Sequence, residues 1–502
     1  MSLKANLAAN YASQIYTAFI GIVMMPLYLS TMGSEAYGLV GIFAMLQAWF
    51  NLLDLGLTPT IAREAARYHG QALPALDYRR VYRALSTIFV AVAVVGGVVL
   101  FLLGDVLAER WLKLERLSPG EVLLALQTIA VAVALRWLGG LYRGVISGAE
   151  RLVWLGGFNA LVATLRFVAV FASMAIWGYE PAVFFWHQLA VAALELGGLW
   201  WKSQALLPSP RGLPEAVGWS LKPVRPLVGF ALGIALTSAV WVLVTQVDKL
   251  LLSGILPLAE FGYFSLAVLV AGGITLLSGP ISSSIMPRMA RLHAEQQAAA
   301  VRQVYEQATQ LVAIVVGTAA TTLAWCAGPI MFAWTGSSEI AHRTEDLLRL
   351  YAIGNGLLAL SAFPFYLQYA RGTLRHHIIG NCAMGVVLIP SVLAAATSFG
   401  AVGAGAAWLA VNALYLLAWV PYAHSRLEPG LHFRWLLHHV LPVVLPMQGV
   451  AAVIHQLSFA PDADRWSAGL YTVGFALVCA ATAVTFSSEG RRILARAVRR
   501  SA

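Results

Sequence analysis

The fold is decided by residues 81–104, VYRALSTIFVAVAVVGGVVLFLLG, an apolar run between Arg80 and Asp105. A helix needs about 20 apolar residues to cross a bilayer, and this run is long enough. Basic residues gather on the cytoplasmic side of membrane proteins, so the run predicts a helix that leaves the cytoplasm. Apolar stretches separated by alternating basic and acidic gaps continue over residues 11–486.

The composition is that of a membrane-embedded chain. Charged residues make up 11% of the 502 residues, whereas a soluble domain carries about 25%. The longest polar gaps, near residues 58–80 and 202–226, are too short to fold alone. The net charge of +10 lies mainly in loops, where anionic lipid explains it, so we expect no nucleic-acid partner. Cys326, Cys382 and Cys479 are far apart and imply neither a disulfide framework nor a metal site.

The apolar segments predict about fourteen transmembrane helices. Helices fit because lipid offers no partner to an unpaired backbone group. The basic gaps place both termini in the cytoplasm, which requires an even number of crossings. The predicted fold is therefore an all-α, multi-pass integral membrane protein. The predicted segments are 10–32, 36–57, 81–104, 121–146, 154–177, 182–201, 226–250, 257–285, 306–333, 346–370, 378–398, 402–424, 438–458 and 467–486.

A faint internal repeat accompanies these segments. EAYG at residues 35–38 precedes the second segment, and AEFG at residues 259–262 precedes the eighth. Each of these two segments ends in a basic stretch, at a constant offset of 224 to 225 residues. Transporters often carry such repeats, with a substrate site between the halves. Chance similarity of short loops is the alternative.

The proline-rich residues 209–225 predict a stiff cytoplasmic linker. With the repeat, this linker divides the chain into a six-helix N-terminal lobe (1–208) and a six-helix C-terminal lobe (226–424). Helices 13 and 14 follow (425–486). The basic tail (487–502) has the pattern of an amphipathic helix and is expected to lie on anionic lipids of the inner leaflet; a disordered tail is the alternative.

Two motifs resemble the first hairpin of polysaccharide-export flippases of the Wzx type: MPLYLSTMGSEAYG at residues 25–38 and LDLGLTPTIAR at residues 53–63. Further matches are QVDK at 246–249 and FGAVGAGAA at 399–407, and the resemblance covers essentially the full chain. It implies membership of the multidrug/oligosaccharidyl-lipid/polysaccharide exporter superfamily, with two helix bundles around a central cavity. It also implies an oligosaccharide on undecaprenyl pyrophosphate as cargo, and association with glycosyltransferases and a polysaccharide polymerase.

Cations inside the predicted spans are candidate binding residues, because a charge at membrane depth is costly and is kept mainly for function. Guanidinium groups match phosphate geometry, so a cationic cavity would attract a diphosphate headgroup. For Lys249 and Arg349, snorkelling to the interface is the alternative; for Arg166 the alternative is a structural ion pair. The cationic candidates are Arg166, Arg136, Lys249 and Arg349.

Three acids are candidates for coupling or for ion pairing. Glu195 lies at a depth similar to that of Arg166 and could pair with it or carry a proton. Asp248 could pair locally with Lys249, and Asp54 ends the second span, where a structural role is the simpler interpretation. No cofactor or metal is predicted, although a proton or sodium gradient could drive transport.

Gly140, Gly144 and Gly148 are spaced by four, which lines one helix face and lets another helix approach closely. This spacing predicts helix packing. The chain contains no GxxxxGK[ST] motif and therefore no P-loop ATPase signature.

Three classes of function are compatible with these features to different degrees. A flippase for lipid-linked oligosaccharide in the bacterial inner membrane accounts for the resemblance and the cationic spans. A multidrug or small-solute antiporter of the same superfamily would favour acidic residues in its cavity. A membrane polymerase or ligase would need a longer outer loop than residues 105–121 provide. We expect a monomer whose lobes rock around a central site.

Overall fold

The computed structural model describes residues 3–210, 213–456 and 464–501, and the regular elements in this part of the chain are all helical. Within these described residues, thirteen helical stretches are long and apolar enough to cross a membrane, which confirms the all-α membrane class. The count of fourteen crossings and the cytoplasmic termini stay predictions. The chain divides into two compact units, Met1–Gly262 (unit 1) and Tyr263–Ala502 (unit 2), which are described separately below.

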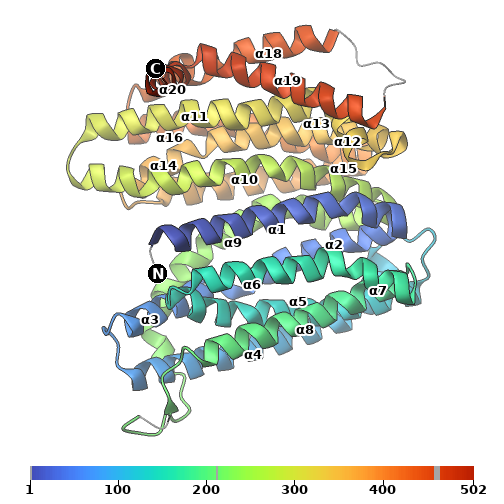
Figure 1. Ribbon diagram of the computed structural model, residues 1–502, viewed down its shortest axis with the longest axis vertical. Coiled ribbons are helices and arrows are strands. Elements are labelled where there is room, and N and C mark those ends of the chain that lie inside the picture. Colours follow the sequence, from blue (N-terminus) through green and yellow to red (C-terminus); the bar gives the residue numbers. More distant parts are fainter. Residues whose placement is uncertain (1–2, 211–212, 457–463, 502) are drawn as a thin grey trace. The chain divides into compact units, whose positions relative to one another are not determined.

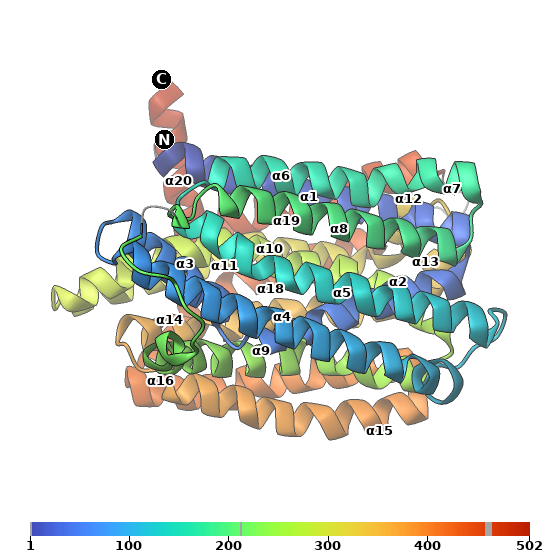
Figure 2. The same cartoon turned by 90° about the horizontal axis from the view of Figure 1, so that it is seen from below.

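Helix α5 is the central element of unit 1. It packs against α2, α3, α4 and α8, and it lies beside α4 and α8 in both views of the chain (Figures 1 and 2). Pro119 and a Ser118–Glu121 capping box start this helix. The elements of unit 1 are α1 (Leu3–Met32), α2 (Ser34–Phe50), η1 (Asn51–Asp54), α3 (Leu57–His69), α4 (Ala75–Val106), η2 (Leu107–Trp111), α5 (Pro119–Gly148), α6 (Leu152–Thr164), η3 (Leu165–Ala169), α7 (Val170–Trp177), α8 (Pro181–Gln204), η5 (Lys222–Leu227), α9 (Val228–Ile255) and the start of α10 (Leu258–Ala294).

Unit 2 is built on α11 and α13, which pack against each other. Helices α18 and α19 lie against α11 through an apolar cluster that includes Ala313, Met447 and Phe475. The elements of unit 2 after α10 are α11 (Ala298–Trp325), α12 (Ala327–Thr335), α13 (Ser338–Ser361), α14 (Phe363–Ala370), α15 (Arg375–Leu414), η6 (Tyr415–Trp419), α16 (Val420–Leu427), α17 (Leu431–Trp435), η7 (Leu436–Val440), α18 (Leu441–Gln456), α19 (Arg465–Phe486) and α20 (Ser488–Ser501).

The long helical stretch Arg375–Leu427 is a hairpin rather than one straight helix. A straight helix of its 53 residues would be about 80 Å long, far more than the ~30 Å of a bilayer core. The backbone reverses at Gly400, where φ is 61° and ψ is −144°. Residues before this glycine contact residues after it: Gly380 faces Trp419, and Ala395 faces Gly403. The structure thus contains two antiparallel arms where the sequence predicts segments 378–398 and 402–424.

The three glycines spaced by four on α5 pack against α3. A Cβ on Gly140 would lie 2.9 Å from Thr58 Oγ1. A Cβ on Gly144 would overlap the Ile61 side chain, and one on Gly148 would overlap the Ala62 carbonyl oxygen. The glycines therefore allow two backbones to approach closely, which confirms the packing role predicted from their spacing.

We expect Gly148→Ala to destabilise the protein, because the new methyl group meets backbone rather than a movable side chain. Overpacking of this kind costs about 1–3 kcal/mol. Thermal unfolding of the purified protein measures the change. The matched control is Gly157→Ala in α6, where nothing lies within 4 Å of the added Cβ, so the melting temperature should hold or rise slightly. Equal melting of the two variants would contradict the close α3–α5 contact.

Glu35, in the first resembling motif, anchors the turn between η2 and α5. This carboxylate is 5% exposed and accepts hydrogen bonds from three successive backbone N–H groups. The distances are 2.8 Å from Glu115, 2.8 Å from Arg116 and 3.0 Å from Leu117. Hydrogen bonds to a charged acceptor are among the stronger ones in proteins, so Glu35 fixes one end of α5.

We expect Glu35→Gln to lower the free energy of unfolding by about 2 kcal/mol or more, because the amide offers one acceptor atom where the carboxylate offers two. The melting temperature of the purified variant reports this loss. Glu109→Gln is the control, because Glu109 is exposed at the same end of unit 1. If both variants melt together, Glu35 does not hold the turn.

The sequence repeat is matched by a reciprocal contact within unit 1. A Cβ on Gly38 would collide with the Leu258 carbonyl oxygen, and one on Gly262 would lie 2.5 Å from the Ser34 carbonyl oxygen. Gly38 and Gly262 are 224 residues apart, and so are Ser34 and Leu258. Adding or subtracting 224 turns the Gly38–Leu258 contact into the Gly262–Ser34 contact. Two copies of a repeat related by a two-fold axis make such reciprocal contacts. This contact supports a true repeat over chance similarity.

The proline-rich linker is docked on α4 rather than free. Arg79 Nε donates to the Pro208 carbonyl at 2.6 Å, and Arg83 Nη1 donates to the Gly218 carbonyl at 3.0 Å. Arg80 forms an ion pair with Glu215 at 2.8 Å. Residues 211–212 of the linker lie outside the described part. The division of the chain into lobes at residues 209–225 stays a prediction.

The basic tail forms helix α20, as its amphipathic pattern predicts. A buried glutamine, Gln310 in α11, holds the start of this helix. Its Oε1 accepts hydrogen bonds from Ser487 Oγ at 2.8 Å, Ser488 Oγ at 2.9 Å and the Glu489 backbone at 2.9 Å. Docking of α20 on anionic lipid stays a prediction.

Candidate functional site

Unit 1 contains a partly open polar cavity of about 460 Å³. Its walls come from α2, η1, α3, α5, η3, α8 and α9, so segments from the whole of unit 1 contribute to it. Three of its side chains are arginines from the membrane-spanning part of the chain. The charged and polar side chains that line it are Gln47, Asn51, Asp54, Thr58, Arg136, Arg143, Arg166, Glu195 and Ser238.

Glu195 on α8 is shared by two arginines of α5. Arg143 Nη2 donates a hydrogen bond to Glu195 Oε1. Arg136 Nε lies 3.9 Å from Glu195 Oε2, within ion-pair distance but too far for a hydrogen bond. Arg136 and Arg143 are seven residues apart, two turns of helix, and therefore lie on the same face. One carboxylate thus faces two guanidinium groups.

Arg136 is the most deeply buried of the three arginines, with 8% of its surface exposed. Its Nη2 donates to Gln188 Oε1 at 3.0 Å and its Nη1 to Gln47 Oε1 at 3.5 Å. Its Cζ lies 4.9 Å from the centre of the Phe43 ring, a cation–π contact. A buried charge is tolerated only with such partners. We therefore infer that Arg136 is a fixed part of the cavity wall.

Arg166 differs from the other two arginines. Its guanidinium lies against the rings of Phe43 and Phe167, at 5.9 and 5.0 Å from their centres. Among the described residues no carboxylate lies within ion-pair distance of it. The direct Arg166–Glu195 ion pair that equal depth suggested is therefore not formed; Arg143 and Arg136 pair with Glu195 instead.

Arg166 sits in η3, a π-helical turn between α6 and α7. Such turns occur mostly as single insertions in α-helices and are frequent at functional sites. Gln188 of α8 connects the turn to Arg136: its Nε2 donates to the Arg166 carbonyl at 3.0 Å while its Oε1 accepts from Arg136. This glutamine therefore fixes the backbone that carries Arg166.

The charge balance of the cavity favours an anion. Three arginines face two carboxylates. Asp54 is occupied locally, because it accepts from the Thr58 backbone N–H at 3.1 Å and from Thr58 Oγ1 at 2.5 Å. It thereby satisfies one backbone N–H in the first turn of α3. With Glu195 held by Arg136 and Arg143, the guanidinium of Arg166 remains for a ligand.

The structure does not gather all the predicted candidates at this cavity. Lys249 Nζ lies 3.7 Å from Asp248 Oδ1 and donates to the Thr245 carbonyl at 2.9 Å, so the predicted local pair is formed. Arg349 belongs to unit 2, where its Nη1 lies 3.2 Å from Asp346 Oδ1. Its Nε donates to the Ala324 carbonyl at 3.2 Å. Binding roles for Lys249, Asp248 and Arg349 stay predictions.

Sequence reasoning missed Arg143 and Gln47, which line the cavity, and Gln188, which holds Arg136 from behind. Arg143 lies within the predicted segment 121–146 but was not among the predicted cationic candidates, and the structure places it against Glu195. Its spacing of seven from Arg136 was an available signal. Gln188 and Gln47 carry no sequence signal of their own, because uncharged polar residues are common in helices.

The fold and the cavity define a class: a multi-pass helical membrane transporter with a charged internal site. The chain belongs to the family of polysaccharide biosynthesis proteins, whose pattern matches residues 3–293. This membership confirms the resemblance found in the two motifs of the first hairpin.

Two individual proteins are similar to most of this chain. A Shigella flexneri protein named "Putative O-antigen transporter" is 19% identical over 428 residues, which cover 84% of this chain and 98% of that protein. "Uncharacterized membrane protein EpsK" of Bacillus subtilis (strain 168) is 21% identical over 400 residues, covering 77% of this chain and 75% of that protein.

Solved structures share the fold. The lipid II flippase MurJ in an inward closed conformation matches with a TM-score of 0.73 at 13% identity, covering 97% of this chain and 99% of that one. An inward-facing multidrug resistance transporter of the MATE family matches with a TM-score of 0.67 at 12% identity, covering 85% and 98%. The relatives with a stated activity are transporters and flippases rather than enzymes, so the polymerase and ligase alternative is set aside.

Proposed function

We propose that this chain is a flippase that moves an oligosaccharide on undecaprenyl diphosphate from the cytoplasmic to the periplasmic leaflet of the bacterial inner membrane. The observation that carries the proposal is Arg166, a cation inside a polar cavity without a carboxylate within ion-pair distance among the described residues. A diphosphate supplies the missing negative charge. The family and the O-antigen relative favour a glycan carrier as its source.

In this proposal the three arginines divide the work of binding. Arg166 makes the primary contact, because its planar guanidinium can hold two phosphate oxygens at once. Arg143, whose side chain is 32% exposed, is the second contact, and the diphosphate competes with Glu195 for it. Arg136 stays in the wall and adds positive potential. The isoprenoid tail remains in the bilayer while the headgroup occupies the cavity.

Transport follows by alternating exposure of the cavity to the two sides of the membrane. Release of Arg143 by the ligand leaves Glu195 with one arginine fewer, which makes this carboxylate the candidate for coupling to protons or sodium. Glycosyltransferases and a polymerase are the expected neighbours of the monomer, because they make and consume its cargo.

The second candidate is a small-solute antiporter, favoured by the shared fold with the MATE family transporter. That activity would use Glu195 to bind a cation or proton. The surplus of arginine in the cavity argues against a cationic solute.

Complementation separates the two candidates. The chain is expressed in a bacterial host that lacks its own flippase but makes the lipid-linked glycan, and surface glycan is scored. Restored glycan without added resistance to toxic cations is the expected result. Resistance without glycan, in a host panel that covers several glycans, would move the assignment to the antiporter.

A further inference from the structure

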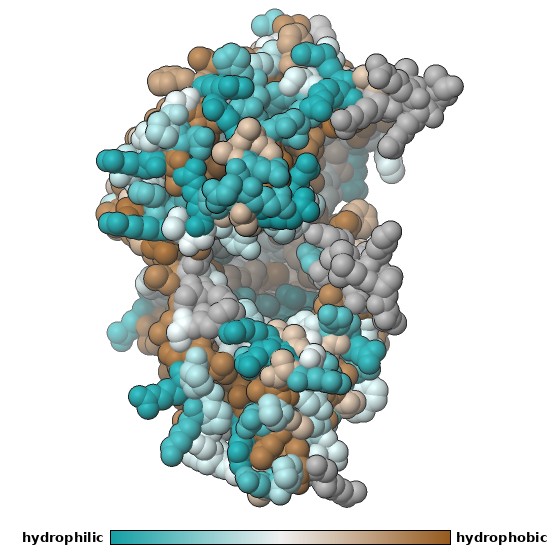
Figure 3. All heavy atoms as spheres, turned by 90° about the vertical axis from the view of Figure 1, so that its left-hand side faces the viewer, coloured by the Kyte–Doolittle hydropathy of each residue, from teal (hydrophilic) through white to brown (hydrophobic). Residues whose placement is uncertain are grey.

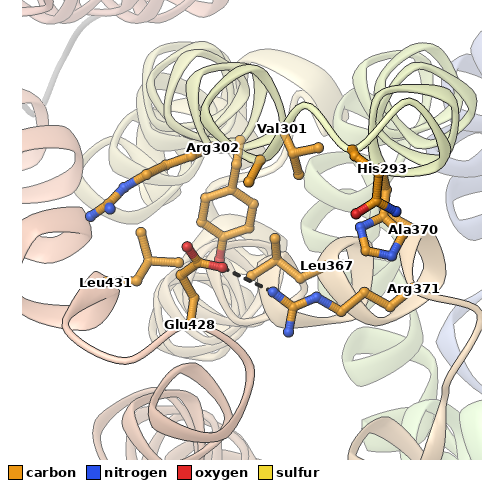
Figure 4. A pocket seen from close by; sticks show the side chains of 11 residues that line it. His293, Val301, Arg302, Leu367, Ala370, Arg371, Glu428 and Leu431 are labelled. Carbon is orange, nitrogen blue, oxygen red and sulfur yellow. Dashed lines mark hydrogen bonds and ion pairs between the residues drawn. The ribbon is translucent and has the colours of Figure 1, made fainter.

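Unit 2 contains a second polar pocket, of about 190 Å³. It lies where the end of α10 and the start of α11 meet the end of α14 and the turn between α16 and α17. Figure 4 shows Arg371 and Glu428 meeting in it, with His293 beside Arg371 and Arg302 on the opposite side. The α10–α11 turn belongs to the end of unit 2 that faces the viewer in Figure 3, where hydrophilic residues gather. This end carries many of the unit's arginines and is the predicted cytoplasmic end.

The pocket combines charged side chains with apolar surface. Its charged side chains are two arginines and one acid, His293 and Gln296 add polar groups, and the rest of its wall is apolar or aromatic. Val301, Leu367 and Leu431 supply apolar surface next to the guanidinium groups (Figure 4). A free inorganic anion would gain nothing from these walls, whereas a phosphate ester on a lipid would use both parts.

The side chain of Arg371 is oriented by the carboxylate of Glu428. Its Nη2 donates to Glu428 Oε2 at 2.9 Å and its Nη1 donates to the Leu427 carbonyl. These bonds use two of the five N–H groups of a guanidinium. The side chains of Arg371 and Glu428 are 30% and 34% exposed, so a ligand can reach both. Arg302 is likewise 32% exposed and lies 3.3 Å from Glu306.

We propose that this pocket binds the headgroup phosphate of an anionic phospholipid from the leaflet at the basic end of the protein. Basic pockets between transmembrane helices on the cytoplasmic side are suited to anionic lipid headgroups. The phosphate takes the place of Glu428 on Arg371 and approaches Arg302 from the other wall. The apolar part of the lipid lies along Val301, Leu367 and Leu431. The site is separate from the cavity of unit 1 and does not depend on the flippase proposal.

Native mass spectrometry of the full-length protein tests the proposal. Phosphatidylglycerol and phosphatidylcholine are titrated separately, with undecaprenyl diphosphate as a third ligand. We expect one phosphatidylglycerol to bind the wild type at least tenfold more tightly than phosphatidylcholine. Arg371→Gln and Arg302→Gln should each weaken that binding about tenfold, the effect of losing one charge-assisted hydrogen bond. Glu428→Gln should strengthen it, because the competing carboxylate is gone.

The matched control is Arg291→Gln, which removes an equal charge at the same end; Arg291 is 69% exposed and does not line the pocket. Its phosphatidylglycerol affinity should equal that of the wild type. Three results would overturn the proposal: no preference for phosphatidylglycerol, an equal loss in Arg291→Gln, or a larger loss for undecaprenyl diphosphate, which would make the pocket a cargo site. If Arg371→Gln fails to fold, Arg302→Gln and Glu428→Gln decide the outcome alone.

Discussion

Arg166→Ala is expected to abolish glycan export in a flippase-deficient host while leaving the protein folded. The guanidinium has no carboxylate partner among the described residues, so its removal leaves no buried charge unpaired. Loss of even one or two hydrogen bonds to a diphosphate weakens binding by about 1.5–3 kcal/mol each, at least tenfold. Surface glycan is scored at matched protein levels, with the melting temperature measured on the purified variant.

Arg166→Lys is the stringent companion, because an ammonium keeps the charge but cannot hold two phosphate oxygens in one plane. We expect it to lose most of the export as well. Arg291→Lys in unit 2 is the control and should export normally, because Arg291 is 69% exposed and pairs with Glu295. Full export by both Arg166 variants would reduce Arg166 to a packing residue against Phe43 and Phe167.

Glu195→Gln is expected to destabilise the protein strongly. The substitution leaves Arg136, which is 8% exposed, without its carboxylate. Breaking a buried pair by removing one partner costs about 3–5 kcal/mol. The melting temperature and the folded yield in detergent measure the effect.

Two further variants show whether the loss of stability in Glu195→Gln comes from the buried ion pair. Glu215→Gln removes a carboxylate that is 68% exposed and pairs with Arg80, and a surface pair of this kind contributes about 0–1 kcal/mol. The double variant Arg136→Gln/Glu195→Gln should regain part of the lost stability, because the buried Arg136 charge no longer remains without its carboxylate. A stable Glu195→Gln protein that no longer exports would instead assign Glu195 to coupling.

Most of the fold could be predicted because membrane solvent constrains it so tightly. Length and apolarity alone placed helices such as α4, α8 and α19 close to their observed bounds. The turn at Gly400 was also anticipated between segments 378–398 and 402–424. The spacing of Gly140, Gly144 and Gly148 predicted a close helix contact, although the sequence could not name α3 as the partner.

The site was harder to predict because depth in the membrane does not determine which face a side chain occupies. Arg166 and Glu195 share a similar depth, yet Glu195 pairs with Arg143 and Arg136. A π-helical turn carries Arg166, and the insertion of such a turn changes the face in a way that a regular 3.6-residue period cannot anticipate.

Composition did not show where the linker packs. Its prolines predict a stiff spacer, and the structure adds that Arg79 binds the Pro208 carbonyl just before it and Arg83 binds the Gly218 carbonyl within it. Their hydrogen bonds depend on where the chain returns to α4, and local sequence does not report that.

Transport by the purified protein in vesicles tests the proposed flippase activity most directly. A fluorescent oligosaccharide on undecaprenyl diphosphate is placed in both leaflets, and a membrane-impermeant reductant quenches the label that reaches the outside. We expect near-complete quenching with wild type and about half in Arg166→Ala vesicles and in protein-free vesicles. Half quenching with folded wild type across several glycans, together with transport of a small cation, would contradict it.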